Sequence, residues 1–208
     1  MQAVGLDAII PETLVGRADK MAILAVDDNL AHCYALSRVL RASGFEVVEA
    51  HTGSAALSFA ADHCPEIVLL DIHLPDVSGY EILKTLRQND STRNIGIIVH
   101  TATESISAGK RHAESLGADA YLTYPIEPEY LVAVVHGTLS RVLERSLNDP
   151  VSAPTPDGQI TILTKCIEVL RNSLASPFIK AELAESIRES LAHVEMDLRR
   201  IKTARKPN

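Results

Sequence analysis

The stretch LLDIHLPDVSG at residues 69–79 decides how this sequence folds, because it joins a buried apolar run to a carboxylate and then to a turn. The run Ile67–Leu70 is short and wholly apolar, which is typical of a strand buried on both faces of a parallel sheet. Asp71 follows this run, and Pro75 and Gly79 then prevent the strand from continuing. A helical pattern begins at the next residue. The stretch therefore indicates one βα unit of an α/β protein.

The same alternation recurs along residues 21–147. Four further strands are predicted from short apolar runs: Ala22–Val26, Glu46–Ala50, Ile95–Val99 and Ala120–Thr123. Helical spacing marks the segments between and after them: Leu30–Arg41, Gly53–Asp62, Tyr80–Gln88, Glu104–Leu116 and Glu129–Leu147. Gly44 and Gly117 follow two of these helices, as C-cap glycines do. Five βα units in series predict an α/β fold with a doubly wound, five-stranded parallel sheet and right-handed crossovers.

Composition indicates a cytoplasmic protein without a membrane span. Hydrophobic residues make up 46% of the 208 residues and charged residues 23%, and no run of 18 apolar residues occurs. The N-terminus lacks the basic start and apolar core of a secretory signal. Three cysteines, Cys33, Cys64 and Cys166, form neither a metal-binding pair nor a disulfide framework, so we expect reduced thiols. The net charge of −7 disfavours a nucleic-acid partner, and no helix-turn-helix is visible.

The chain divides into five segments. We expect an N-terminal extension (1–20), the α/β domain (21–147), a proline-rich linker (148–158), a helical segment (159–203) and a short tail (204–208). Net charge is uneven, at −9 for residues 1–149 and +2 for residues 150–208, as expected of two units with different functions.

The helical segment reads as an α-helical hairpin. Its first helix carries an apolar face made of Ile160, Leu163, Ile167, Leu170 and Leu174. The second helix, with a start predicted at Ser176-Pro177, carries a coiled-coil-like seam made of Ile179, Leu183, Ile187, Leu191, Val194, Leu198 and Ile201. Two such helices cannot bury their apolar faces alone. We therefore expect the hairpin to pack on the α/β domain or on a second copy, and to mediate dimerisation or docking.

Carboxylates follow two of the predicted strands. Asp27 and Asp28 come after the first strand, Asp71 comes after the third, and Thr101 ends the fourth. If the strand order is the flavodoxin-like 2-1-3-4-5, the first and third strands are neighbours and these carboxylates converge. Crowded carboxylates require a cation, and Mg²⁺ prefers such oxygen ligands. With Mg²⁺ bound, a carboxylate can accept a phosphoryl group while Thr101 donates a hydrogen bond to it.

Four motifs occur in an order that resembles a known family. They are VDDN at 26–29, LLDIHLPDVSGYE at 69–81, HTA at 100–102 and AYLTYPI at 120–126. Together they resemble the receiver domain of two-component response regulators, of the chemotaxis-regulator-like kind.

The resemblance implies phosphorelay signal transduction rather than enzymatic output. A partner histidine kinase would transfer its phosphoryl group to Asp71, with self-catalysed transfer and hydrolysis also possible. Asp28 and Asp71 would ligate Mg²⁺ through their side chains, His73 through its backbone carbonyl, and Asp27 through a water molecule. Thr101 and Tyr121 match the family's switch pair, and the signal would leave through protein–protein contacts.

The sequence departs from this family at Tyr124, which occupies the position of the usual lysine. Tyrosine offers a hydrogen bond but no positive charge, and Lys110 is the nearest lysine along the chain. Tyr124 is therefore either a weakened part of the switch, a rebuilt one, or a residue that only fills the pocket.

Two alternative functions stay open on the sequence alone. One is a receiver-like scaffold that works without phosphorylation. The other is a regulatory fragment of kinase-like architecture, in which His193 would be the residue of interest. Val194 follows His193, where a kinase's phosphoacceptor histidine is usually followed by an acidic residue.

Overall fold

The computed structural model describes residues 22–102, 106–148, 156–175, 179 and 181–204. Its α/β domain holds a five-stranded parallel sheet in the order β2-β1-β3-β4-β5, as predicted. The strands are β1 (Ala22–Val26), β2 (Glu46–Ala50), β3 (Ile67–Asp71), β4 (Gly96–Thr101) and β5 (Ala120–Thr123). The helices of this domain are α1 (Leu30–Ala42), α2 (Gly53–His63), α3 (Gly79–Gln88), α4 (Ile106–Ser115) and α5 (Pro128–Asn148).

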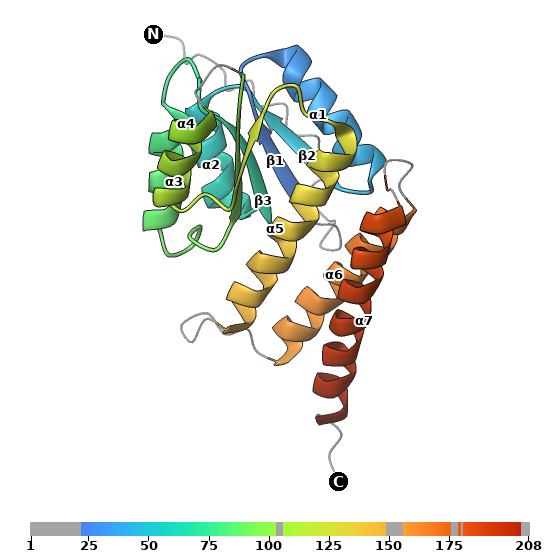
Figure 1. The fold of residues 1–208 in the computed structure, drawn as a ribbon. Helices are drawn as coiled ribbons and strands as arrows, with labels where there is room; N and C mark the ends of the chain where they lie inside the picture. Colours follow the sequence, from blue (N-terminus) through green and yellow to red (C-terminus); the bar gives the residue numbers. More distant parts are fainter. Residues whose placement is uncertain (1–21, 103–105, 149–155, 176–178, 180, 205–208) are drawn as a thin grey trace, which may run out of the picture.

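Two layers of helices cover the sheet, α1 and α5 on one face and α2, α3 and α4 on the other (Figure 1). Successive residues of a strand point to opposite faces, so β1 contributes to both cores. Ile23 and Ala25 are buried in the core on the side of α1 and α5. Leu24 and Val26 are buried in the core on the opposite side. This two-sided burial explains why the strands read as continuous apolar runs.

Strand β4 differs from the apolar run Ile95–Val99 at both ends, because it begins at Gly96 and continues to Thr101, the residue predicted to end it. His100 pairs with Asp71 of β3, and Thr101 pairs with Thr123 of β5. The polar end of the strand therefore lies in the ladder between two neighbours. An apolar pattern cannot reveal this extension, because the added residues are polar but buried.

The hairpin consists of α6 (Pro156–Leu174) and α7 (Ala181–Ala204), which lie side by side and run in opposite directions (Figure 1). Helix α6 begins at Pro156, inside the stretch predicted as linker, and proline is favoured at the first helical position. The predicted helix start at Ser176-Pro177 lies outside the described residues. Among the helices that the structure describes, none has the length and apolarity needed to span a membrane.

The hairpin packs on the α/β domain, which is one of the two arrangements that the sequence predicts. The buried residues of the hairpin include Leu163, Cys166, Ile167, Leu170, Ala184 and Ile187. Cys166 belongs to the same core as Ile23 of β1, and Val194 of α7 packs against that core. Helix α6 also contacts α5. Part of the apolar face is thus buried within one chain.

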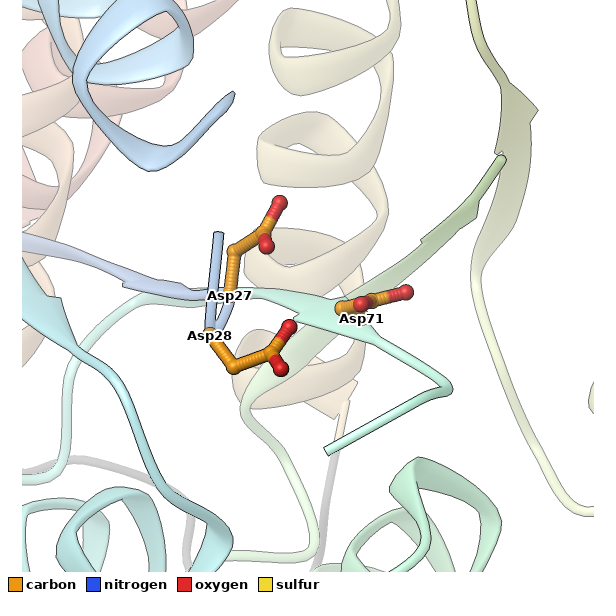
Figure 2. A group of neighbouring side chains, drawn as sticks. All are labelled: Asp27, Asp28 and Asp71. Atoms are coloured by element: carbon orange, nitrogen blue, oxygen red, sulfur yellow. The ribbon is translucent and has the colours of Figure 1, made fainter. Parts of the chain in front are cut away.

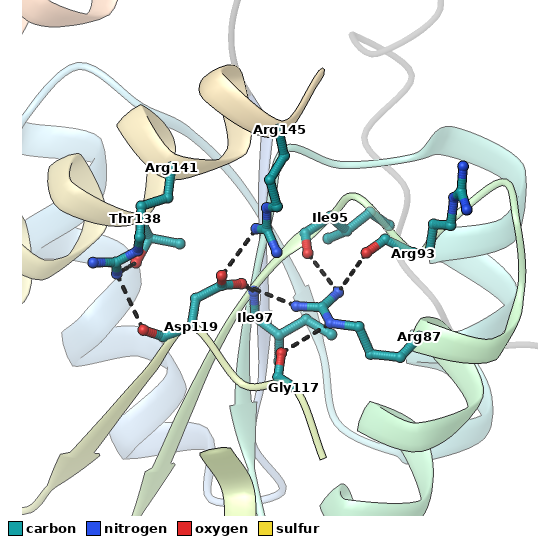
Figure 3. A network of polar contacts seen from close by, with 9 residues as sticks. All are labelled: Arg87, Arg93, Ile95, Ile97, Gly117, Asp119, Thr138, Arg141 and Arg145. Atoms are coloured by element: carbon teal, nitrogen blue, oxygen red, sulfur yellow. Dashed lines mark hydrogen bonds and ion pairs between the residues drawn. The ribbon is translucent and has the colours of Figure 1, made fainter. Parts of the chain in front are cut away.

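A polar network joins α3, β4, β5 and α5 at the edge of the sheet where the strands begin (Figure 3). One carboxylate oxygen of Asp119 accepts hydrogen bonds from Ile97 N–H at 2.8 Å and from Arg87 at 2.9 Å. The other oxygen lies 2.9 Å from Nη2 of Arg145. Arg87 also donates to the backbone carbonyls of Arg93, Ile95 and Gly117. Arg87 therefore ties the end of α3 to the start of β4 and to the turn before β5.

Candidate functional site

The three carboxylates predicted to converge do lie together (Figure 2). Asp27 and Asp28 follow β1, and Asp71 is the last residue of β3. Strands β1 and β3 are neighbours, with Val26 paired to Leu70, so both strands deliver their ends to the same place. One oxygen from each carboxylate lies within 4.8 Å of those of the other two. This spacing allows the three side chains to share one cation.

Asp27 is the most buried of the three, with 2% of its surface exposed. Its Oδ1 accepts a hydrogen bond from Asn29 N–H at 2.8 Å, while Oδ2 is buried and has no hydrogen-bond partner among the described residues. Burial raises the pKa of Asp27 to about 6, the hydrogen bond from Asn29 opposes this rise, and the charge of Asp71 adds to it. A nearby cation would remove the penalty of keeping this carboxylate ionised.

Asp71 is half-buried, whereas Asp28 is exposed. Burial raises the pKa of Asp71, and the negative charge of Asp28 acts in the same direction. The backbone N–H groups of His73 and Ile72 donate hydrogen bonds to the Asp71 carboxylate and lower its pKa in part. Partial access to solvent and a fixed orientation suit a carboxylate that attacks an incoming group.

The donor set of this cluster fits Mg²⁺. Three carboxylates supply hard oxygen ligands, and one of them retains a buried oxygen without a protein partner. A shallow hollow of about 420 Å³ lies beside them and is lined by Asp28, Tyr80 and residues 72–78 of the β3–α3 loop. The cluster thus opens toward solvent next to the loop that carries His73, whose side chain is exposed.

Hydrogen bonds fix the β3–α3 loop where its two ends meet and at Asp76 between them. Gly79 N–H donates to the carbonyl of Ile72 at 2.9 Å, which closes the loop behind Asp71. The Asp76 carboxylate accepts hydrogen bonds from the first two N–H groups of α2, those of Gly53 at 2.7 Å and Ser54 at 2.9 Å. These bonds lower the pKa of Asp76 to about 2. Sequence reasoning gave Asp76 no role, because Gly53 and Ser54 lie 23 and 22 residues away along the chain.

Thr101 and Tyr121 lie on adjacent strands beyond Asp71. Thr101 is 1% exposed at the end of β4, and Tyr121 of β5 is half-buried against the core on the side of α2, α3 and α4. The carbonyl of Thr101 accepts a hydrogen bond from Tyr124 N–H at 3.1 Å. The backbone therefore connects Thr101 directly to the position where the family pattern is broken.

Tyr124 lies between two histidine rings. Its ring stacks on His32 with centroids 4.5 Å apart and meets the edge of His100 at 5.7 Å. His100 could not be placed here from the sequence, because nothing in a strand pattern shows that a polar residue near the strand end is buried. The nearest lysine in sequence, Lys110, lies exposed on α4 with its Nζ 3.9 Å from Glu114.

His193 lies at an exposed position on α7, and its Nδ1 is 3.1 Å from the carbonyl oxygen of Glu189 one turn earlier. The ring thus contacts the backbone of its own helix.

Comparison with known proteins agrees with the fold. Residues 23–136 match the response regulator receiver domain family. The polar-differentiation response regulator DivK of Brucella anthropi is 32% identical over 114 residues, which are 54% of this chain and 92% of that protein. DivK of Brucella ovis is 31% identical with the same coverage.

Solved structures show the same similarity. A putative response regulator from Chloroflexus aurantiacus is 35% identical, with a TM-score of 0.56 over 59% of this chain and 99% of that one. A receiver domain from Bermanella marisrubri is 31% identical, with a TM-score of 0.53 over 58% and 98% of the two chains. This protein belongs to the receiver-domain family of response regulators.

Proposed function

We propose that this chain is a two-component response regulator that accepts a phosphoryl group on Asp71 from a partner histidine kinase. The observation that carries the proposal is the convergence of Asp27, Asp28 and Asp71 at the ends of β1 and β3 in a receiver domain. Signalling by contact with other proteins follows from the absence of a recognisable enzymatic or DNA-binding motif in the sequence. We place the protein in the cytoplasm, where such a kinase presents its phosphohistidine.

The proposed transfer requires one nucleophile. A carboxylate oxygen of Asp71 attacks the phosphorus of a phosphohistidine, the P–O bond forms as the P–N bond breaks, and the departing imidazole keeps the electron pair and gains a proton. Mg²⁺ held by Asp28, Asp71, the carbonyl of His73 and, through water, Asp27 would balance the charge of the phosphoryl oxygens. Thr101 is the proposed hydrogen-bond donor to one of these oxygens, and Tyr121 completes the proposed switch pair.

An acid-labile phosphorylation assay with acetyl phosphate and Mg²⁺ tests this proposal. Asp71→Asn should abolish incorporation, and Asp28→Ala should weaken Mg²⁺ binding severely. Asp62→Asn is a matched control, because Asp62 is an exposed carboxylate on α2 and should leave incorporation unchanged. Full incorporation into Asp71→Asn would show that the acceptor is a different residue.

We further propose that residues 21–147 act as the receiver and residues 159–203 as a homodimerisation and docking segment. The apolar seam of α7 is only partly covered, because Leu191, Val194, Leu198 and Ile201 are half-buried and Met196 is 57% exposed. A second copy of the hairpin would cover this remaining surface in a bundle of four helices.

One observation favours a second candidate function, a receiver-like scaffold that works without phosphorylation. Tyr124 replaces the usual lysine, and its hydroxyl is buried. Titration with beryllofluoride and Mg²⁺, followed by NMR, separates the two functions. A response centred on Thr101 and Tyr121 supports the phosphorylated switch, and an unchanged spectrum supports the scaffold.

A further inference from the structure

Two histidine rings lie beside the inner carboxylate oxygen of Asp27, and the ring of Tyr124 contacts both of them. Nδ1 of His32 lies 3.8 Å from Asp27 Oδ2, and Nδ1 of His100 lies 4.0 Å from the same oxygen. Tyr124 bridges these two histidines, stacked on His32 at an interplanar angle of 23° and edge-on to His100 at 77°. The other oxygen of Asp27 is held by Asn29 N–H. His32 and His100 beside Oδ2 of Asp27, with Tyr124 in contact with both, form one aromatic cluster, which we call the enclosure.

The hydroxyl of Tyr124 does not face solvent. Its oxygen is buried and makes no hydrogen bond to the described residues. A phosphoryl group must approach Asp71 from solvent, so a buried hydroxyl is poorly placed to meet it. The electrostatic surroundings agree, because after burial the charges of Asp27 and then Asp71 are the largest causes that raise the pKa of Tyr124. Among the charges that act on Tyr124, that of Asp27 therefore has the largest effect.

We infer that Tyr124 is a positioning residue for Asp27, and that it sets the affinity for Mg²⁺ instead of contacting the phosphoryl group. The inference rests on the proposed magnesium site. It also explains the departure from the family pattern. Tyr124 occupies the position of the usual lysine, but its ring positions a carboxylate of the proposed Mg²⁺ site.

The enclosure acts by fixing the rotamer of Asp27 and by excluding water from the side of its carboxylate that faces the rings. A carboxylate in water must lose part of its hydration before it can bind a cation. A buried carboxylate has already lost that hydration when the protein folded. Groups that orient metal-binding side chains typically change metal affinity by 10- to 100-fold when they are removed. Loss of the Tyr124 ring should admit water to Asp27 and release His32 from its stack.

Calorimetric titration of the full chain with Mg²⁺, without any phosphodonor, tests the inference directly. Tyr124→Ala should weaken Mg²⁺ binding about ten-fold. His32→Ala removes the half-exposed wall of the enclosure, should fold normally, and should change the affinity in the same direction. Tyr124→Phe keeps the ring and should bind Mg²⁺ as the wild type does. Tyr34→Ala is the control, because Tyr34 lies on α1 with His32 but is 57% exposed.

The Mg²⁺ dependence of acetyl-phosphate labelling gives a second readout. For Tyr124→Ala and His32→Ala, the Mg²⁺ concentration at half-maximal rate should rise about ten-fold while the maximal rate at saturating Mg²⁺ stays the same. A lower maximal rate in Tyr124→Phe with unchanged Mg²⁺ affinity would overturn the inference, because the hydroxyl would then act on the phosphoryl group. Wild-type Mg²⁺ affinity in both alanine variants would also overturn it. Calorimetry detects the effect even if Asp71 accepts no phosphate, so failure of the proposed function is seen separately.

Discussion

A side chain at position 79 would collide with the backbone of Asp71. A Cβ built on Gly79 would lie 2.2 Å from the carbonyl oxygen of Asp71 and 2.8 Å from Cα of Ile72. The start of α3 therefore packs directly against the end of β3, and this contact sets the path of the loop between them. Glycine is required here by close approach of two backbone segments.

Gly79→Ala should displace this loop and impair the site. Because the clash is with backbone atoms, relief requires Asp71 or α3 to move, at a cost of about 1 to 3 kcal/mol in the free energy of unfolding. Urea denaturation and Mg²⁺ calorimetry measure the two effects. Gly137→Ala is the matched control, since nothing lies within 4 Å of a Cβ at this position in α5, and it should stabilise the protein by about 0.5 to 1 kcal/mol. Wild-type stability and Mg²⁺ affinity in Gly79→Ala would refute the prediction.

Mg²⁺ binding should weaken as the pH falls below about 6, the value to which burial raises the pKa of Asp27. A proton on Asp27 removes a negative charge from the cluster, and the raised pKa of Asp71 acts in the same direction. Without cation, the raised pKa of Asp27 favours folding most below its ordinary value of 3.8, and this contribution is lost as the pH rises through about 6. Calorimetry between pH 5 and pH 8 should show the loss of affinity. Asp27→Asn should bind Mg²⁺ more weakly at every pH and should lose less Mg²⁺ affinity on acidification. If its Mg²⁺ affinity depends on pH as that of the wild type does, the titrating group is not Asp27.

His136 should make the folded state sensitive to acid. Its side chain is buried beside Phe45 with ring centroids 5.4 Å apart, and burial lowers the pKa of His136 to about 4 from 6.5. As the pH falls, His136 is protonated in the unfolded chain before it is protonated in the folded protein. The contribution of neutral His136 to the free energy of unfolding is therefore complete above the unfolded pKa of 6.5 and is lost as the pH falls toward about 4. The loss should amount to about 3 kcal/mol.

Urea denaturation as a function of pH measures this loss. His136→Leu should flatten the dependence between pH 7 and pH 4. His193→Gln is the control and should follow the wild type, because His193 is exposed on α7. If His136→Leu loses as much stability between pH 7 and pH 4 as the wild type does, another group is responsible for the acid sensitivity.

Asp119 should be worth more to stability than the other carboxylates far from the site. Asp119→Ala leaves Arg87 and Arg145 without their shared partner, and breaking a buried ion pair in this way typically costs about 3 to 5 kcal/mol. Asp90→Asn removes an exposed carboxylate 3.8 Å from Arg93 and should cost no more than about 0.5 kcal/mol. Chemical denaturation compares the two variants. Equal stabilities would mean that the Asp119 network contributes little.

The full chain should sediment as a dimer, whereas a chain truncated after Leu147 should be a monomer. Met196→Glu places a charge on the exposed apolar part of α7 and should shift the full chain toward monomer. Arg200→Glu changes an exposed residue of the same helix and serves as the control. Analytical ultracentrifugation that shows a monomeric full chain at high concentration would exclude the proposed dimer.

The sequence predicted the sheet well because its signal is local and repeated. Each βα unit carries an apolar run, a helical segment and often a glycine, so the five parallel strands could be placed, whereas the order 2-1-3-4-5 was taken from the flavodoxin-like fold. The convergence of Asp27, Asp28 and Asp71 followed from that order, since the first two residues come after β1 and Asp71 ends β3. Burial of polar residues has no such pattern: the sequence placed Thr101 at the end of β4, but it did not predict that His100 beside it is buried.

Long-range polar contacts also escaped prediction. Arg87 and Asp119 are 32 residues apart, and no spacing rule links a helix end to a turn before a distant strand. The bonds from Gly53 and Ser54 to Asp76 span 23 and 22 residues in the same way. Such contacts depend on where side chains meet after the backbone has folded, which a single sequence does not encode in any periodicity.

The burial of Cys166 in the core of the α/β domain has a consequence for synthesis on the ribosome. Every other buried member of that core lies between Ile23 and Leu139 and therefore leaves the ribosome earlier. The nascent chain can form its sheet while this patch of the core still faces water, and the patch closes only after α6 has emerged. The last quarter of the chain thus completes the folding that the first three quarters begin.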